Sequence, residues 1–267
     1  MSPSGANPWR RATPLAMAHR GQRASVPEQT LEAYRVAIDL GAEAIECDVQ
    51  RTRDGRLVMF HDLTLDRTTD GTGPLAGIDW EGLQRLDAGS WFDPRFAGLR
   101  VPSLEDTIDL ALQAGVPLCI EIKGTPDDAR TTAEVVASLL RERGLVDRMV
   151  VSSFDHGALA AAARTAPGLF LAPERLPESG PPDPDAAVAQ ARALGAAVLQ
   201  HRWEDLTRDV VDALHAAEVA VWSWPIDSLE SIAQSVAVGV DGIIGDDVPL
   251  LLEGLGRTQA AGAREAS

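Results

Sequence analysis

Two histidines and three acids stand in or directly after short apolar runs, where polar side chains are uncommon. They are His19, Glu46, Asp48, His61 and Glu121. Histidine titrates near neutral pH, so one ring of a pair can accept a proton while the other donates one. Carboxylates that are buried without partners cost several kcal/mol each, and a bound cation offsets that cost. These residue types therefore predict an acid–base pair beside a divalent cation.

The acids have the spacing that shared ligation from strands requires. Residues two apart in a strand point to the same face, so Glu46 and Asp48 face together. Glu121 and Lys123 share a face for the same reason. Ligation by oxygen alone favours Mg²⁺ or Ca²⁺ over Zn²⁺. The alternative is a salt-bridge network without a metal, in which Arg20 and Lys123 neutralise the acids.

Arg20 and Lys123 also indicate the charge of the ligand. A guanidinium group pairs bidentately with phosphate oxygens, and an ammonium group acts on them as a point charge. Together with a cation, the two side chains would neutralise a phosphodiester and the charge that develops in its transition state. A phosphate-containing substrate is therefore expected.

The other histidines and the cysteines carry a weaker signal. His156 begins a predicted helix and His215 lies inside one, so both are expected to be structural. His201 follows an apolar run and either lines the pocket or is structural. Cys47 and Cys119 lie within apolar runs, which is typical of buried, reduced thiols.

Eight apolar runs of strand length lie along the chain. They lack polar alternation, as expected of parallel strands buried on both faces. The runs cover residues 15–18, 44–49, 118–122, 149–154, 169–172, 197–199, 219–224 and 242–244. Helical patterns separate them at residues 30–40, 104–114, 130–143, 158–166, 185–194, 209–217, 229–238 and 248–255. Eight successive strand–helix units predict a single-domain (β/α)₈ barrel, with a doubly wound sheet as the alternative.

The barrel is expected over residues 14–255, with flexible termini at 1–13 and 256–267. Residues 176–184, which include several prolines, are predicted to form a surface loop. One long excursion interrupts the repeat after the second strand. It begins with 56–60 and continues through a glycine-rich turn at 71–73 to residue 100, at the barrel end where loops carry chemistry.

The composition limits the possible partners. The 267 residues carry a net charge of −16, so a basic footprint for nucleic acid is absent. No apolar run reaches the length of about 18 residues that a membrane span needs, and the N-terminus does not resemble a secretory signal. We expect a cytoplasmic protein without a stable membrane anchor. The sequence leaves its oligomeric state open.

The candidate residues fall within motifs that resemble those of the glycerophosphodiester phosphodiesterases. The likeness extends from Pro14 to Leu252. Its pieces are His19-Arg20-Gly21, Pro27-Glu28-Gln29-Thr30, Glu46-Cys47-Asp48-Val49, Leu57-Val58-Met59-Phe60-His61-Asp62, Leu65-Asp66-Arg67-Thr68-Thr69-Asp70-Gly71-Thr72-Gly73, Val101-Pro102-Ser103-Leu104-Glu105-Asp106, Glu121-Ile122-Lys123, Val221-Trp222-Ser223-Trp224 and Gly239-Val240-Asp241-Gly242-Ile243-Ile244-Gly245-Asp246. The order of these pieces makes the resemblance specific.

The resemblance implies a TIM barrel with an insertion at 62–99. It also implies divalent-cation-dependent hydrolysis of glycerophosphodiesters, such as deacylated phospholipids, to glycerol 3-phosphate and an alcohol. The implied catalytic residues are His19 and His61, and by analogy we assign His19 as base and His61 as acid, with the reverse left open. The implied metal ligands are Glu46, Asp48 and Glu121, and the implied substrate-binding residues are Arg20, Lys123, Trp222 and Glu28. Trp222 could instead be barrel packing, and Glu28 could instead orient Arg20.

Two departures from the family pattern affect substrate preference more than the reaction. Gln29 stands where the family usually has Asn, and Trp224-Pro225 stands where an Asn tends to follow the seventh-strand Trp. A lysophospholipid or another phosphodiester is the same-class alternative, which Trp91-Phe92 would favour as an apolar loop at the mouth. A catalytically silent phosphate-binding barrel and a metal-dependent aldolase or sugar-isomerising barrel are the alternatives from other classes.

Overall fold

The strands close into a barrel. A computed structural model of the chain describes residues 7–176 and 182–257. Within those residues, eight strands run parallel in the order β6-β5-β4-β2-β1-β9-β8-β7, and β3 (Leu57–Met59) pairs antiparallel with β2. A parallel bridge between Glu174 and Gln200 joins the two ends of this order. The parallel strands are β1 (Leu15–His19), β2 (Ala44–Arg51), β4 (Leu118–Ile122), β5 (Val150–Ser153), β6 (Phe170–Pro173), β7 (Val198–Arg202), β8 (Ala220–Ile226) and β9 (Gly242–Gly245). The predicted barrel is confirmed, and the open doubly wound sheet is wrong.

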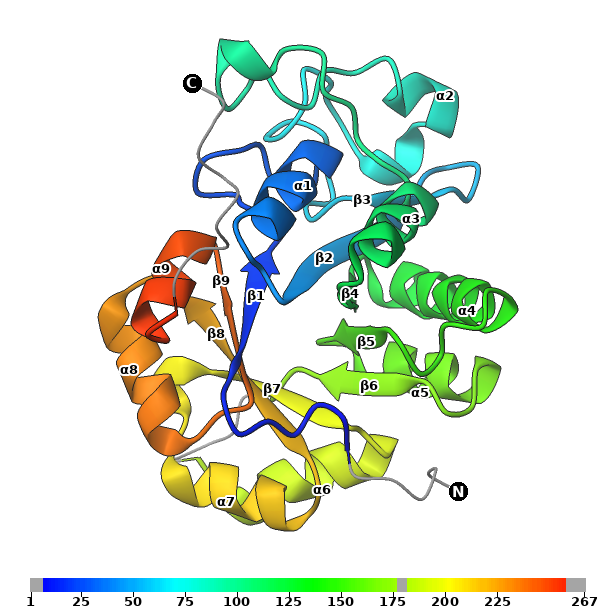
Figure 1. Cartoon of the computed structure of the whole chain (residues 1–267). Coiled ribbons are helices and arrows are strands. Elements are labelled where there is room, and N and C mark those ends of the chain that lie inside the picture. Colours follow the sequence, from blue (N-terminus) through cyan, green and yellow to red (C-terminus); the bar gives the residue numbers. More distant parts are fainter. Residues whose placement is uncertain (1–6, 177–181, 258–267) are drawn as a thin grey trace.

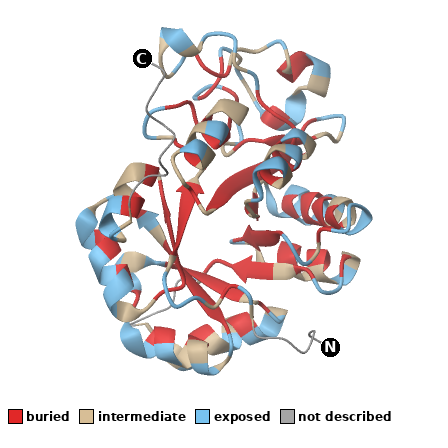
Figure 2. Ribbon diagram, viewed as in Figure 1, coloured by how far each residue is buried: buried red, intermediate tan, exposed pale blue. Residues whose placement is uncertain are grey.

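Helices surround the strands on the outside (Figure 1). They are α1 (Leu31–Asp39), α3 (Leu104–Ala114), α4 (Pro126–Glu142), α5 (His156–Thr165), α6 (Pro184–Leu194), α7 (Arg208–Ala216), α8 (Leu229–Val238) and α9 (Val248–Gly254). Each turns an apolar face to the strands and an exposed face to solvent, while the strands are buried nearly throughout (Figure 2). The described helices include none that is long and apolar enough to cross a membrane.

Local sequence signals set where most helices begin and end. Ser103 and Asp106 form a capping box at the start of α3, and Gly115 ends that helix in the left-handed conformation with φ 72°. Helix α4 begins at Pro126, four residues before the predicted start at residue 130. Proline favours the first helical turn, because its missing N–H is not needed there.

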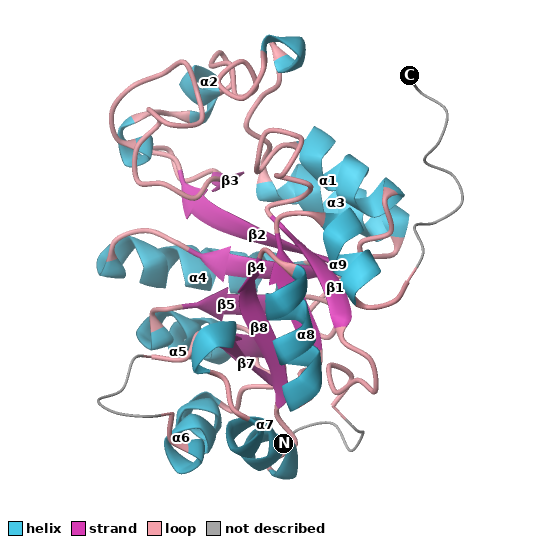
Figure 3. Cartoon of the chain, turned by 90° about the vertical axis from the view of Figure 1, so that its left-hand side faces the viewer, coloured by secondary structure: helices cyan, strands magenta, loops and turns pink. Residues whose placement is uncertain are grey.

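The excursion after β2 forms a small substructure of its own. It contains β3, two short 3₁₀ helices, η1 (Leu75–Gly77) and η2 (Pro94–Phe96), and α2 (Trp80–Leu83). A separate apolar cluster that includes Val58, Leu65 and Leu83 holds it together. In Figure 3 it lies beyond the tip of β2, at the end toward which the arrowheads of β2, β4 and β5 point. The insertion therefore stands beside the carboxyl ends of the strands.

The first described residues pack against the barrel, although the sequence suggests a flexible terminus over 1–13. Trp9 is 8% exposed and its ring meets those of Trp222 and Phe170 edge to face, at 5.5 and 5.8 Å between centroids. The side chain of Asn7 donates to the backbone of Ala197 and Glu218. A single tryptophan before the first strand gives no periodic pattern, so its docking could not be inferred. Residues 1–6, 177–181 of the predicted 176–184 loop, and 258–267 of the predicted 256–267 tail lie outside the described residues.

Candidate active site

The strand register brings the predicted chemical residues together at one end of the barrel. His19 pairs with Glu46 across β1 and β2, and Asp48 pairs with Glu121 across β2 and β4. His61 follows β3, which the antiparallel pairing to β2 holds beside the same end. A cavity of about 270 Å³ opens there, and His19, Glu46, His61 and Glu121 line it together with Arg20 and Lys123.

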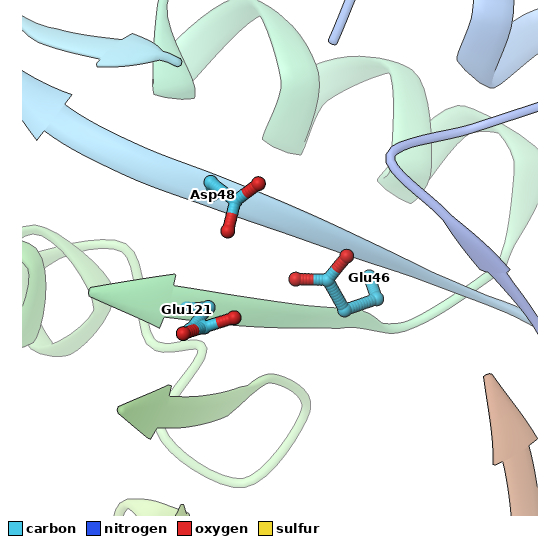
Figure 4. Close-up of side chains that lie close together, drawn as sticks. All are labelled: Glu46, Asp48 and Glu121. Carbon is cyan, nitrogen blue, oxygen red and sulfur yellow. The ribbon is translucent and has the colours of Figure 1, made fainter. Parts of the chain in front are cut away.

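Glu46, Asp48 and Glu121 form an acid triad. Each offers an oxygen that lies within 4.8 Å of the other two, and all three residues are buried. Figure 4 shows the carboxylates converging from β2 and β4. Among the described residues, both oxygens of Glu46 and Oδ1 of Asp48 lack a hydrogen-bond partner. Buried unpaired oxygens of this kind suit a hard divalent cation, so the triad fits the predicted metal site.

Ion pairs satisfy part of the triad without a metal. Arg20 Nε lies 2.8 Å from Asp48 Oδ2, and Lys123 Nζ lies 2.6 Å from Glu121 Oε1 and 3.4 Å from Asp48 Oδ1. The alternative salt-bridge network therefore exists around Asp48 and Glu121. It does not reach Glu46, whose one ion pair among the described residues is the contact of Oε2 with His19 Nε2, at 3.8 Å. Within that part of the chain, Glu46 thus has no arginine or lysine partner.

The pKa values of the triad follow from this unequal pairing. Burial, then the charges of Asp48 and Glu121, raises the pKa of Glu46 well above its usual value. Burial and Asp48 likewise raise the pKa of Glu121 to about 7. Burial acts in the same direction on Asp48, but Arg20 and Lys123 outweigh it and hold that pKa below its usual value. Without a cation the cluster therefore disfavours full ionisation.

Each candidate histidine has an aspartate on its Nδ1. His19 Nδ1 lies 2.7 Å from Asp246 Oδ1, and His61 Nδ1 lies 2.6 Å from Asp62 Oδ1. A carboxylate on Nδ1 fixes the ring and leaves Nε2 for proton exchange. Burial lowers the pKa of both rings, and the neighbouring carboxylates offset this only in part. A neutral imidazole that can accept a proton at Nε2 follows from that balance.

Glu28 is the centre of an ion-pair network that includes three arginines. Its carboxylate contacts Arg20 at 2.9 Å, Arg67 at 2.9 Å and Arg23 at 3.3 Å. Arg67 also binds Asp62, with its Nε 2.7 Å from Oδ2. Glu28 is not among the residues that line the 270 Å³ cavity. The substrate-binding role given to it is therefore not supported by its position, whereas the alternative of orienting Arg20 is.

The substitution of Gln29 for the usual Asn keeps a contact with the triad. Gln29 Nε2 donates to Asp48 Oδ2 at 2.6 Å, and the hydroxyl of Tyr34 donates to the Gln29 amide oxygen. The backbone of Gln29 has φ 61°, a left-handed conformation that Asn adopts more readily than Gln. Gln29 therefore forms a hydrogen bond with Asp48, although the family usually has Asn at this position.

Trp222 does not lie at the mouth. It is fully buried in the apolar cluster with Trp9 and Met17, as expected if its role is packing inside the barrel. Trp224, two residues further along β8, lines the cavity instead. Alternation places both side chains on the same face, so only their height along the strand separates them. That height depends on register, which a strand sequence does not give.

Several residues of the site are not identified from the sequence. Asp246 directly follows β9 and Asp62 lies three residues after β3, and both fall within the quoted family motifs without a role being assigned to them. Phe154, Glu174, Gln200 and Trp224 also line the cavity. His201, by contrast, is not among the lining residues and its Nδ1 lies 2.8 Å from the carbonyl oxygen of Arg202.

The two histidines expected to be structural have structural contacts. His156 Nε2 lies 2.8 Å from the carbonyl oxygen of Glu174. His215 Nε2 lies 2.8 Å from Asp241 Oδ2, at the opposite end of the barrel strands. Cys47 and Cys119 are free, buried thiols as predicted.

Known proteins share both the fold and the span that holds the site. A family described as the glycerophosphoryl diester phosphodiesterase family matches residues 19–250. A glycerophosphodiester phosphodiesterase of Caldanaerobacter subterraneus subsp. tengcongensis is 34% identical over 238 residues, which cover 89% of this chain and 96% of the relative. One of Bacillus altitudinis is 33% identical over 230 residues, which cover 86% and 93%.

A solved structure agrees with these relatives. The phosphodiesterase of Oleispira antarctica in complex with the product sn-glycerol-3-phosphate is 27% identical and superposes with a TM-score of 0.83, covering 91% of this chain and 97% of that one. The two histidines and the acid triad all fall within the span that the family model matches. The chain belongs to the glycerophosphodiester phosphodiesterase family and is a phosphoric diester hydrolase.

Proposed function

We propose that this enzyme hydrolyses glycerophosphodiesters to glycerol 3-phosphate and an alcohol. The main support for this proposal is a single cavity that contains two histidines, each bonded to an aspartate. The same cavity contains the buried acid triad and the two cations Arg20 and Lys123. The positive charges of Arg20 and Lys123 can bind a phosphate group, and the histidines can transfer protons at its ester oxygens. The complex of the Oleispira antarctica relative with sn-glycerol-3-phosphate supports that product.

Glu46, Asp48 and Glu121 would hold a divalent cation, Mg²⁺ or Ca²⁺. When bound, it supplies positive charge for the phosphate and for the charge that develops in the transition state. Arg20 and Lys123 add fixed positive charge at the same cavity, and their own carboxylate partners hold them in place. Burial alone would lower the pKa of Lys123, but Asp48 and Glu121 outweigh it and raise that pKa, so the ammonium stays charged.

The histidines divide the proton transfers between them. His19 Nε2 removes a proton from the nucleophile, which is water or a neighbouring hydroxyl of the substrate. His61 acts in its imidazolium form, which it reaches by taking up a proton from solvent, and its Nε2 protonates the leaving alkoxide. Asp246 and Asp62 stabilise the imidazolium form of each ring through Nδ1, as the aspartate of a hydrolase triad does.

Release of glycerol 3-phosphate from a panel of glycerophosphodiesters, with EDTA and metal add-back, tests the proposal. Each positioned acid or base contributes about 10²–10⁴-fold, so His19→Ala and His61→Ala should each lower kcat by at least about 100-fold. His156→Ala is the matched control, because that ring is outside the cavity lining. No release from any member of the panel, or near-normal turnover in either catalytic variant, would contradict the assignment.

Lysophospholipids are added to this panel for a structural reason. Phe154 at the cavity is 45% exposed, and Trp91 and Leu63 of the insertion are 37% and 54% exposed. Apolar side chains of this kind would suit an acyl chain. Faster release from a lysophospholipid than from its deacylated counterpart would favour that substrate.

A further inference from the structure

Arg67 connects the aspartate that supports His61 to the body of the barrel. Its guanidinium group donates to Asp62 through Nε at 2.7 Å and Nη2 at 2.9 Å, and to Glu28 through Nη1 and Nη2, both at 2.9 Å. Arg67 belongs to the insertion, whereas Glu28 is buried in the segment between β1 and α1. One side chain of the insertion thus binds two carboxylates, one on each side of it.

The backbone around His61 is held by a different side chain. Gln50, which is buried in β2, directs its Nε2 to the carbonyl oxygens of residues 60, 61 and 62, at 3.0, 3.0 and 2.7 Å. The insertion also has an apolar cluster of its own. Removal of the Arg67 guanidinium group would therefore leave this segment in place and would free chiefly the carboxylate of Asp62.

The Asp62 carboxylate depends on such support. Its side chain is 26% exposed, so water competes for the oxygens, one of which lies 2.6 Å from His61 Nδ1. Two parallel bonds from Arg67 fix the plane of the carboxylate. The same bonds outweigh partial burial and hold the pKa of Asp62 below its usual value, so the carboxylate stays ionised. An ionised and oriented Asp62 retains the proton on Nδ1 of His61 and leaves Nε2 free to act on the substrate.

Arg23 offers a comparison on the side of the other histidine. It lies 3.3 Å from Glu28, 3.6 Å from Asp246 and 3.4 Å from His19 Nδ1. Each of these contacts is longer than the four hydrogen bonds of Arg67. The two arginines share the Glu28 carboxylate, but the tighter support is given to the ring assigned as the proton donor.

We propose that Arg67 is a positioning residue that holds Asp62 on His61 and thereby controls protonation of the leaving alcohol. This inference rests on the proposed function. As the bond between phosphorus and the alcohol oxygen breaks, the proton on His61 Nε2 moves to that oxygen. An alkoxide needs this proton, whereas p-nitrophenolate is stable enough to leave without it. Arg67 is not among the residues that line the cavity, so its loss should change kcat rather than KM.

The test compares glycerophosphocholine with the p-nitrophenyl ester of glycerol 3-phosphate. Arg67→Gln should lower kcat for glycerophosphocholine about 10–100-fold with KM unchanged, and should leave kcat for the p-nitrophenyl ester within about 3-fold. Arg67→Lys keeps the charge without the planar fork, and should show the same selectivity with a smaller loss. If Arg67→Gln does not fold, Arg67→Lys decides by the same comparison.

Two other arginines serve as matched controls. Arg23→Gln removes an arginine from the same Glu28 carboxylate but on the side of His19, so any loss of kcat should be equal on the two esters. Arg85→Gln removes an exposed arginine of the insertion that pairs with Glu81, and should follow wild type on both esters.

A double variant separates positioning from general damage to the structure. Asp62→Asn alone should show the same selective loss, and adding Arg67→Gln should lower kcat by less than about 3-fold further, because Arg67 acts through Asp62. Wild-type kcat in Arg67→Gln, a rise in KM alone, losses that multiply in the double variant, or an equal fall on both esters in a variant that melts like wild type would overturn the inference. Wild-type enzyme that releases glycerol 3-phosphate from neither ester would instead remove the proposed function itself.

Discussion

Glu46→Gln should stabilise the protein in the absence of a divalent cation and should remove most of the stabilisation that the cation gives to wild type. The Glu46 side chain is 4% exposed, and neither of its oxygens has a hydrogen-bond partner in the described chain. Burial, followed by Asp48 and Glu121, raises its pKa well above the usual value. The native protein therefore binds more protons than the unfolded chain once the pH exceeds about 4.5, so the contribution of Glu46 to stability falls as pH rises from there. Glutamine has the same shape and no charge.

The size of the stability change can be worked out separately for the protein without the cation and with it. An unpaired buried carboxylate costs several kcal/mol, so in EDTA at pH 8 the variant should be about 1–3 kcal/mol more stable than wild type, and the difference should shrink toward pH 5. With the cation at one hundred times Kd, wild type gains about 2.7 kcal/mol by mass action. If losing one ligand weakens binding one hundred-fold, the variant gains only about 0.4 kcal/mol.

Thermal melting in EDTA, Mg²⁺ or Ca²⁺ measures both effects. A domain of this size shifts by about 2 °C per kcal/mol, so the cation should raise the wild-type Tm by roughly 5 °C and the variant Tm by about 1 °C. Glu204→Gln, which removes an exposed carboxylate, should follow wild type in every buffer. A variant that melts several degrees below wild type in EDTA would refute the reasoning about burial. A variant with the full wild-type response to the cation would refute the ligand assignment.

Three further outcomes are expected. Asp246→Asn should lower kcat about 10²–10⁴-fold with little change in KM, because an amide at this position does not stabilise the imidazolium form of His19 through Nδ1. Steady-state kinetics of a variant that melts like wild type would check this prediction. Trp9→Ala should destabilise the protein by about 3 kcal/mol in denaturant titration while KM stays unchanged, since Trp9 packs at the barrel end away from the cavity. In EDTA, the free energy of unfolding should fall by up to about 3 kcal/mol between pH 4.5 and 7, because the Glu121 pKa of about 7 exceeds its value in the unfolded chain. Glu121→Gln should make the free energy of unfolding less dependent on pH over this range, as urea titration at several pH values would measure.

The sequence alone determined the barrel and most of the reacting groups. Apolar runs without polar alternation, separated by capped helical patterns, specify parallel strands covered by helices on one side. Polar residues at the ends of those runs, such as His19 and Glu121, then stand at a common edge, because the carboxyl ends of parallel strands lie together. Each of these signals is local in the chain, which is why it can be read without the fold.

The tertiary structure decided what depends on distance across the barrel. The height of a side chain along a strand separates Trp222, buried in the core, from Trp224, which lines the cavity, and only the register fixes that height. The aspartate partner of His19 lies 227 positions away at Asp246, so no local pattern joins them. The burial of Glu174 and its bond to Trp224 arise from strands brought together by closure of the barrel. Pairing, burial and register are properties of the closed sheet, so they are absent from any single stretch of the chain.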